Sequence, residues 1–194
     1  MNNPLEIEFQ PIQNGELPEN IFTTDFNGIF TIQRPVFADE RGDFWEVARV
    51  PDIEKTIQQP FKVQQINRSR NIKKGSLRGI HVATWYKLIF IDRGSAFIAL
   101  VDLRTNSPTF GKVFNETIGD NQKTIAILIP PGFGNSYQAL EDNTDYMYVV
   151  TDLWSPGSEV GISWKDPTFN IQWPITPPIL SPKDEKNPFL ESIR

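Results

Sequence analysis

The stretch "KLIFIDRGSAFIALVDL" (residues 87–103) sets two apolar segments on either side of a two-residue turn, Arg93 and Gly94. Both segments are rich in β-branched and aromatic residues, which is typical of β-strands. Similar short segments recur along the chain, at 28–37, 44–50 and 61–70 among others. Because turn-forming residues separate them at intervals of roughly 8–12 residues, the sequence predicts an all-β sandwich or barrel.

Helical signals are few. The stretch "DIEKTIQQ" (52–59) is the best helix candidate, and it is about two turns long. Prolines crowd the C-terminal part of the chain, which predicts an irregular segment there with few helices. The 194 residues contain no internal repeat or linker, so we expect a single domain over residues 1–194 with its core in 28–190.

Composition and charge exclude several kinds of function. The net charge of −5 argues against a broad basic surface, so we expect no nucleic-acid partner. The chain has no cysteine, which excludes disulfides, thiolate catalysis and cysteine metal sites. No apolar run approaches ~20 residues and the N-terminus lacks a signal-peptide profile, so we expect no membrane association and a cytoplasmic location.

The only histidine, His81, lies in "SLRGIHVATWYKL" (76–88). If residues 82–86 form a hairpin connection, His81 and Lys87 lie opposite one another with their Cβ atoms ~5 Å apart. A single straight strand would instead separate them by ~20 Å. On spacing alone, His81 is either a hydrogen-bonded core residue or a catalytic base. Zinc and iron sites normally need two or three imidazoles, so we expect no metal.

A second polar pattern lies in "FKVQQINRSR" (61–70), where Gln65, Asn67 and Ser69 alternate onto one face. Such a face is either exposed to solvent or lines a polar pocket. Arg41 and Arg78 could bind phosphate bidentately, or could be solvated turn residues.

Taken in order, a set of motifs makes a more specific signal. They are "FADERGDFWE" (37–46), "QQINRSRNIKKGSLRGIH" (64–81), "KLIFIDRGSAFIALVDLRTNSPTFGK" (87–112), "IPPGFGNSYQALEDNTDYMYVVTD" (129–152), "ISWKDPTFNIQWP" (162–174) and "ILSPKD" (179–184). Together they resemble the dTDP-4-dehydrorhamnose 3,5-epimerase family over residues 28–190. The resemblance implies a cupin-type jelly-roll with short peripheral helices and a homodimer. It also implies a nucleotide-sugar substrate linked to dTDP, and neither a metal nor an organic cofactor.

The resemblance also implies a catalytic set. A C4 ketone acidifies the hydrogens on C3 and C5 of the sugar, and removing one needs a base and a group that stabilises the enolate oxygen. The family's base matches His81, its orienting aspartate matches Asp184, and its enolate-facing lysine matches Lys87. The proton donor matches Tyr148, although Tyr146 is two residues earlier and would share its face.

Further positions match the family's ligand site, and some of these residues are expected to be contributed across the dimer. They are Arg41, Glu46, Gln65, Asn67 and Arg78. Trp154 stands where many members have a tyrosine, and we expect it to offer a stacking surface to the nucleotide or the sugar.

The chain departs from the family in three places. Members typically read "PPGFAHGF" where this chain has "PPGFGNSY" (130–137), so Asn135 replaces a second histidine. The aspartate that accompanies that histidine corresponds to Ile98. The connection 82–86 is also shorter than usual. These changes leave open inversion at C3, at C5 or at both, a 3,4-ketoisomerase, and a sugar-nucleotide-binding cupin without catalysis.

Overall fold

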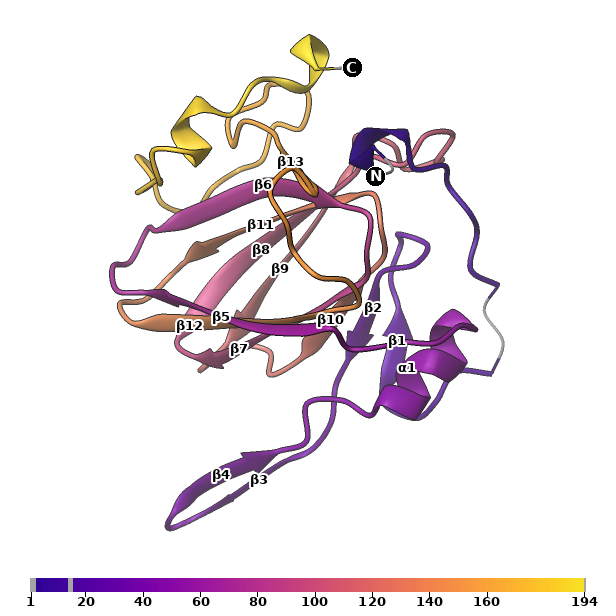
Figure 1. The fold of residues 1–194 in the computed structure, drawn as a ribbon. Coiled ribbons are helices and arrows are strands. Elements are labelled where there is room, and N and C mark those ends of the chain that lie inside the picture. The colour runs from indigo at the N-terminus through magenta and orange to yellow at the C-terminus, as the bar shows by residue number, and fades with distance from the viewer. Residues whose placement is uncertain (1–2, 14–15, 194) are drawn as a thin grey trace.

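The computed structural model describes residues 3–13 and 16–193, and within them two antiparallel sheets face one another (Figure 1). The six-stranded sheet has the order β1 (Ile21–Thr23), β2 (Phe30–Ile32), β10 (Ala126–Ile129), β7 (Lys87–Arg93), β12 (Thr144–Val150) and β5 (Gln65–Asn71). The five-stranded sheet has the order β13 (Glu159–Gly161), β6 (Leu77–Ala83), β11 (Phe133–Ala139), β8 (Ser95–Asp102) and β9 (Val113–Gly119). The prediction of an all-β sandwich is confirmed.

Successive strands in the middle of the chain change sheets. β6 belongs to the five-stranded sheet, β7 to the other, and β8 to the five-stranded sheet again. The turn between β7 and β8 is therefore a corner, where Gly94 adopts a φ of +73° and a Cβ would lie 2.7 Å from Thr144 Oγ1. The stretch 82–86 is likewise not a hairpin connection, because the chain crosses from one sheet to the other after β6. Neither of the two arrangements considered for His81 and Lys87 is found, because the two residues lie on separate strands in different sheets.

The space between the sheets is apolar over most of its extent. Ile98 and Leu100 of β8 pack there with Ile89 of β7 and Ile127 of β10, and all four are fully buried. β-branched side chains on alternating positions of both sheets thus exclude water from the middle of the sandwich.

Two sequence-based boundaries differ from the structure. Residues 28–37 are split into β2 and β3 (Val36–Asp39), with Pro35 between them lacking a backbone N–H for a continuous ladder. The predicted strand at 44–50 is shorter in the structure. Strand β4 (Gly42–Trp45) ends at Trp45, and helix α1 (Val50–Ile57) begins at Val50. The expected helix is thus present, shifted by two residues, and Gln58 ends it in the left-handed conformation.

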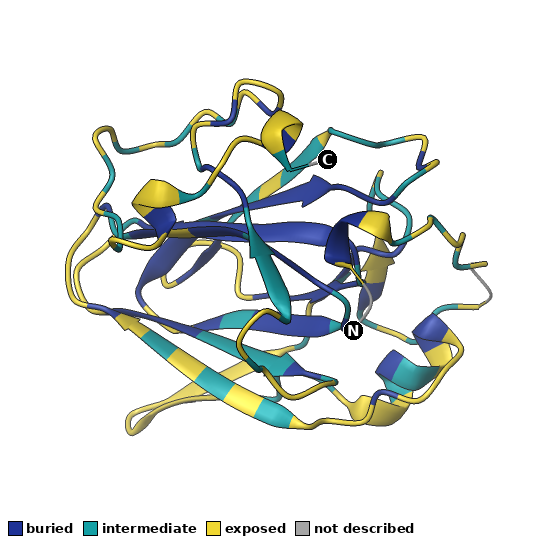
Figure 2. Cartoon of the chain, turned by 45° about the horizontal axis from the view of Figure 1, so that its top comes forward, coloured by how far each residue is buried: buried dark blue, intermediate teal, exposed yellow. Residues whose placement is uncertain are grey.

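Strands β3 and β4 form a hairpin that projects from the body of the molecule (Figure 1). It is exposed along most of its length (Figure 2). Phe37 and Phe44 are opposite one another in its register and are 64% and 66% exposed.

The C-terminal segment follows an irregular path over the outer face of the five-stranded sheet (Figure 1). Up to residue 193, its regular structure apart from the short strand β13 is limited to the 3₁₀ turns η2 (Asp184–Lys186) and η3 (Leu190–Ser192); η1 (Pro4–Glu6) lies near the N-terminus. The irregular C-terminal segment was predicted and is confirmed. None of the helices within the described residues is long and apolar enough to cross a membrane.

Candidate active site

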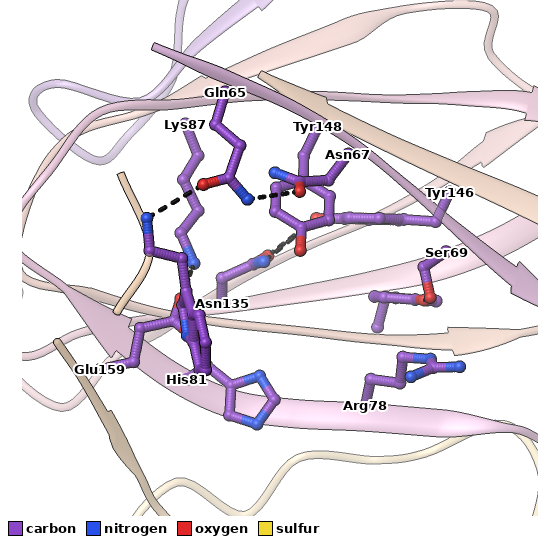
Figure 3. Close-up of a pocket in the computed structure, with 12 residues that line it drawn as sticks. Gln65, Asn67, Ser69, Arg78, His81, Lys87, Asn135, Tyr146, Tyr148 and Glu159 are labelled. Carbon is purple, nitrogen blue, oxygen red and sulfur yellow. Dashed lines mark hydrogen bonds and ion pairs between the residues drawn. The ribbon is translucent and has the colours of Figure 1, made fainter. Parts of the chain in front are cut away.

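A cavity of about 350 Å³ opens between the two sheets (Figure 3). Its lining residues come from strands of both sheets and from the segment after β12. They are Gln65, Asn67, Ser69, Arg78, His81, Lys87, Asn135, Tyr137, Tyr146, Tyr148, Trp154 and Glu159. Most of the residues expected from the sequence are therefore brought together at one place.

The polar face of β5 forms one wall of the cavity. Gln65, Asn67 and Ser69 alternate with exposed residues along this edge strand, so all three point inward. Gln65 donates from Nε2 to Asn67 Oδ1 (2.6 Å) and accepts a hydrogen bond from the backbone N–H of Trp154 (3.0 Å). Of the two interpretations of this pattern, the polar pocket is confirmed.

His81 of β6 is held by Asp184 of η2. The distance from His81 Nε2 to Asp184 Oδ1 is 2.8 Å, and Asp184 is only 4% exposed. Burial opposes ionisation of this carboxyl group, but the hydrogen bonds from His81 and Ser181 outweigh it, and the pKa of Asp184 is lowered. An ionised Asp184 accepts a hydrogen bond from the Nε2–H group of His81, which leaves Nδ1 as the ring nitrogen able to take up another proton.

Lys87 of β7 reaches across the sandwich to Glu159 of β13. The ion pair joins Lys87 Nζ and Glu159 Oε1 at 2.8 Å, and Lys87 is 5% exposed. Burial would raise the pKa of Glu159, but the charge and hydrogen bond of Lys87 lower it below its ordinary value. The Lys87 ammonium also lies 5.9 Å from the ring centroid of Trp85. The cavity thus holds a fixed positive charge facing a carboxylate.

Two tyrosines of β12 line the cavity with different surroundings. Tyr146 is 1% exposed, and its hydroxyl lies within hydrogen-bond distance of the Asn135 side-chain amide. Tyr148 is half-buried, and burial together with the nearby charge of Glu159 raises the pKa of its hydroxyl. The Tyr148 hydroxyl has no hydrogen-bond partner in the part of the chain that the structure describes. It is therefore a protonated donor that a ligand can reach.

Asn135 of β11 lies directly opposite His81 of β6 in the register of the five-stranded sheet. An amide at this position forms hydrogen bonds but does not titrate. Ile98 is fully buried in the core and cannot orient a titrating group. Of the two departures from the family pattern, Asn135 lines the cavity and Ile98 lies in the core, and together they leave His81 as the only imidazole of the cavity.

Arg41 and Glu46 do not line the cavity. Arg41 lies at the turn of the β3–β4 hairpin, where it pairs with Asp39. Glu46 follows β4 and pairs with Arg34 and Arg49. The structure therefore does not bring these two residues to the site within one chain.

Two lining residues received no assignment from the sequence. Glu159 is in a three-residue strand without an alternating pattern, so nothing local marks it as the partner of a buried lysine. Tyr137 is part of the quoted motif "PPGFGNSY", where the typical family motif ends in phenylalanine, and that difference is the signal that could have drawn attention to it.

Comparisons with known proteins agree with this geometry. The family model described as dTDP-4-dehydrorhamnose 3,5-epimerase matches residues 23–192. A protein of that name from Shigella flexneri is 33% identical over 169 residues, which cover 85% of this chain and 92% of the relative. A dTDP-4-dehydrorhamnose 3-epimerase from Streptomyces niveus is 31% identical over 86% of this chain and 82% of its own.

Among solved structures, a dTDP-6-deoxy-D-glucose-3,5-epimerase from Legionella pneumophila, in complex with dTDP-4-keto-L-rhamnose, superposes with a TM-score of 0.83. It is 32% identical, and the match covers 90% of this chain and 94% of that one. The sandwich is accordingly a cupin jelly-roll, as expected from the sequence.

Proposed function

The chain belongs to the dTDP-4-dehydrorhamnose 3,5-epimerase family and is an isomerase, and we propose that it inverts C3, C5 or both in a dTDP-linked 4-keto-6-deoxy sugar. The observation that carries the proposal is the placement of His81 and Tyr148. His81 projects from the five-stranded sheet and Tyr148 from the six-stranded sheet, and both line one cavity. A base and an acid on two sides of a bound sugar are what inversion at carbon requires.

The proposed reaction begins when His81 Nδ1 removes a proton from a carbon beside the C4 ketone. The electron pair moves onto the C4 oxygen, and the Lys87 ammonium stabilises the resulting enolate. Tyr148 then delivers its phenolic proton to the opposite face of the same carbon. Proton exchange with solvent returns His81 to the neutral form and Tyr148 to the protonated form. Asp184 acts by holding His81 in one tautomer and by favouring its positive charge after proton abstraction.

We place the nucleotide along the remaining polar wall. Gln65 and Asn67 offer amide groups, Trp154 offers a half-exposed ring at the mouth, and Arg78 offers a positive charge for the diphosphate. The proposed substrate is thus anchored at its dTDP end, while the sugar lies between His81 and Tyr148.

A homodimer would explain how Arg41 and Glu46, which do not line the cavity of their own chain, could contribute to a site. The β3–β4 hairpin projects from the body and carries the exposed pair Phe37 and Phe44. We propose that this hairpin docks on a second copy, so that Arg41 and Glu46 reach the partner's cavity. We also propose that the chain forms one domain, is located in the cytoplasm and serves deoxysugar biosynthesis.

Within this proposal, one observation favours inversion at a single carbon. The observation in its favour is the replacement of a titrating His–Asp pair by Asn135 and Ile98, which leaves one imidazole in the cavity. A site with fewer titrating groups has fewer ways to exchange protons on both sides of the ketone.

The test is incubation with dTDP-4-keto-6-deoxyglucose in D2O, with the C3 and C5 protons followed by NMR. Exchange and inversion at both carbons support a 3,5-epimerase, and exchange at one carbon supports the single-carbon reaction. Transfer of the ketone from C4 to C3 would instead indicate a ketoisomerase. Binding without exchange would contradict the proposed reaction for this sugar and would favour a binding protein.

A further inference from the structure

Two residues of β11 stand opposite two functional residues of β6. Asn135 faces His81 and Tyr137 faces Arg78 in the register of the five-stranded sheet. The register shifts between these pairs, where Gly79 has a φ of +114° and a Cβ would lie 2.6 Å from the Asn135 backbone oxygen. The close approach of β6 to β11 thus fixes the positions of both pairs relative to one another.

Tyr146 connects the two pairs from the other sheet. Its ring stacks on Tyr137, with centroids 3.9 Å apart and planes 3° from parallel. Its hydroxyl lies 3.1 Å from Asn135 Nδ2. One rigid aromatic pair therefore lies between the end of the cavity that holds His81 and the end that holds Arg78.

The Tyr137 hydroxyl continues this connection to Arg78. It donates to Ser69 Oγ (2.9 Å) and accepts from Asn71 Nδ2 (3.1 Å). Asn71 is buried, and its Oδ1 accepts from Arg78 Nε at 3.0 Å. The orientation of the guanidinium therefore depends on Asn71. Asn71 Nδ2 also donates to the backbone oxygens of Ser69 and Thr144, so the Tyr137 hydroxyl is one of three acceptors that orient Asn71.

Arg78 differs from the other cation of the cavity. Lys87 is neutralised by Glu159, whereas Arg78 has no ion-pair partner among residues 3–13 and 16–193. In Figure 3, Arg78 and Ser69 lie at one end of the view, while Lys87 and Gln65 lie at the other. The unpaired guanidinium is the part of the cavity best suited to the phosphates of a nucleoside diphosphate.

We propose that Tyr137 is a positioning residue that sets Arg78, and through it the diphosphate of the substrate, at a fixed distance from His81. This inference rests on the proposed function, and it names the residue by which this chain orients its substrate. The hydroxyl does the positioning, because the ring alone would preserve the stack on Tyr146 but not the contacts to Ser69 and Asn71.

The test compares Tyr137→Phe with Tyr146→Phe, a matched change of the other ring in the same stack. The binding of dTDP is measured by isothermal titration calorimetry, and kcat and KM are measured with dTDP-4-keto-6-deoxyglucose. Loss of one hydrogen bond that orients a charged group should weaken dTDP binding and raise KM about tenfold in Tyr137→Phe. We expect kcat to change less than KM. Tyr146→Phe, whose hydroxyl contacts Asn135, should leave the dTDP affinity within about twofold of wild type.

A double-mutant cycle with Arg78→Gln shows whether Tyr137→Phe weakens dTDP binding through Arg78 or through a general loss of packing around the cavity. If Tyr137 acts through Arg78, Tyr137→Phe should not weaken dTDP binding further in the Arg78→Gln protein. Ser69→Ala is a second variant on the same hydroxyl, and its weaker effect on dTDP affinity should also vanish in that background. A melting curve for each variant confirms that it is folded before affinities are compared.

The outcomes for this inference and for the proposed function differ. If the wild type binds dTDP and Tyr137→Phe binds it equally well, the positioning role is overturned while the proposed function stands. If Tyr137→Phe weakens dTDP binding equally in the wild-type and Arg78→Gln backgrounds, the positioning role is overturned as well. Failure of the wild type to bind dTDP would contradict the proposed function itself.

Discussion

Asn135 and His81 lie directly opposite one another on β11 and β6, and Asn135 is tied to the buried hydroxyl of Tyr146. The strand beside the proposed base therefore carries a neutral amide that is hydrogen-bonded to a buried hydroxyl. Asn135 and His81 are thus held by separate contacts, with Tyr146 and with Asp184 respectively.

Removing the Asn135 amide should destabilise the protein. Asn135→Ala leaves the Tyr146 hydroxyl buried and unpaired, which should lower the free energy of unfolding by about 1–3 kcal/mol. Urea denaturation measures the change. In the control, Asn135→Ala combined with Tyr146→Phe should recover part of the loss, because no orphaned hydroxyl remains. A double variant whose loss equals the sum of the two single losses would show that the contact contributes nothing.

Asp184→Asn should lower kcat by about 10²–10⁴-fold, because an amide neither stabilises a positively charged His81 nor fixes its tautomer. KM should change far less, since Asp184 lies behind the imidazole and is not among the residues that line the cavity. Glu185→Gln, an exposed neighbour on the same 3₁₀ turn, is the matched control and should have unchanged kinetics. Steady-state rates that hardly differ between the two variants would remove Asp184 from the mechanism.

Tyr148→Phe should slow net inversion more than proton exchange, because exchange requires only the base while inversion also requires the acid. The two rates are measured on one sample by NMR in D2O. Tyr146→Phe is the control on the same strand, and its inversion and exchange rates should change in proportion. A silent Tyr148→Phe with a strongly impaired Tyr146→Phe would reverse the assignment of the acid.

The Lys87–Glu159 pair should make stability depend on pH in acid. In the folded protein the pKa of Glu159 lies below its ordinary value of 4.5. The ion pair therefore contributes fully to stability above pH 4.5, and this contribution is lost as the pH falls through the folded pKa. At neutral pH, the free energy of unfolding of the wild type should exceed that of Glu159→Gln by about 1.5–3 kcal/mol. Unfolding free energies measured at a series of pH values should show this difference shrinking below pH 4.5. A difference that is constant with pH would mean that the carboxylate charge is not responsible.

Much of the fold could be read from the sequence, because strand alternation and turn chemistry are local signals. The face of β5 that bears Gln65, Asn67 and Ser69 is an example, since a period of two is visible without any partner strand. The pairing of His81 with Asp184, 103 residues apart, required the family resemblance, because no local pattern encodes it.

Other features were hidden because a corner and a hairpin share the same short turn sequences. The connection after β6 resembles a hairpin locally, yet it carries the chain to the facing sheet and places Lys87 across the sandwich. Glu159 was missed for a related reason, since its importance arises from a partner 72 residues away.

The proposed base and the proposed acid lie on different sheets, so the proposed reaction depends on how the two sheets are held together. His81 and Tyr148 do not lie on paired strands. The apolar layer packed between the two sheets keeps them at a fixed separation. Loosening of that layer would separate them even while each sheet kept its own ladder of hydrogen bonds. The turnover rate should therefore respond to a loss of packing between the sheets before any spectroscopic signal of β-structure does.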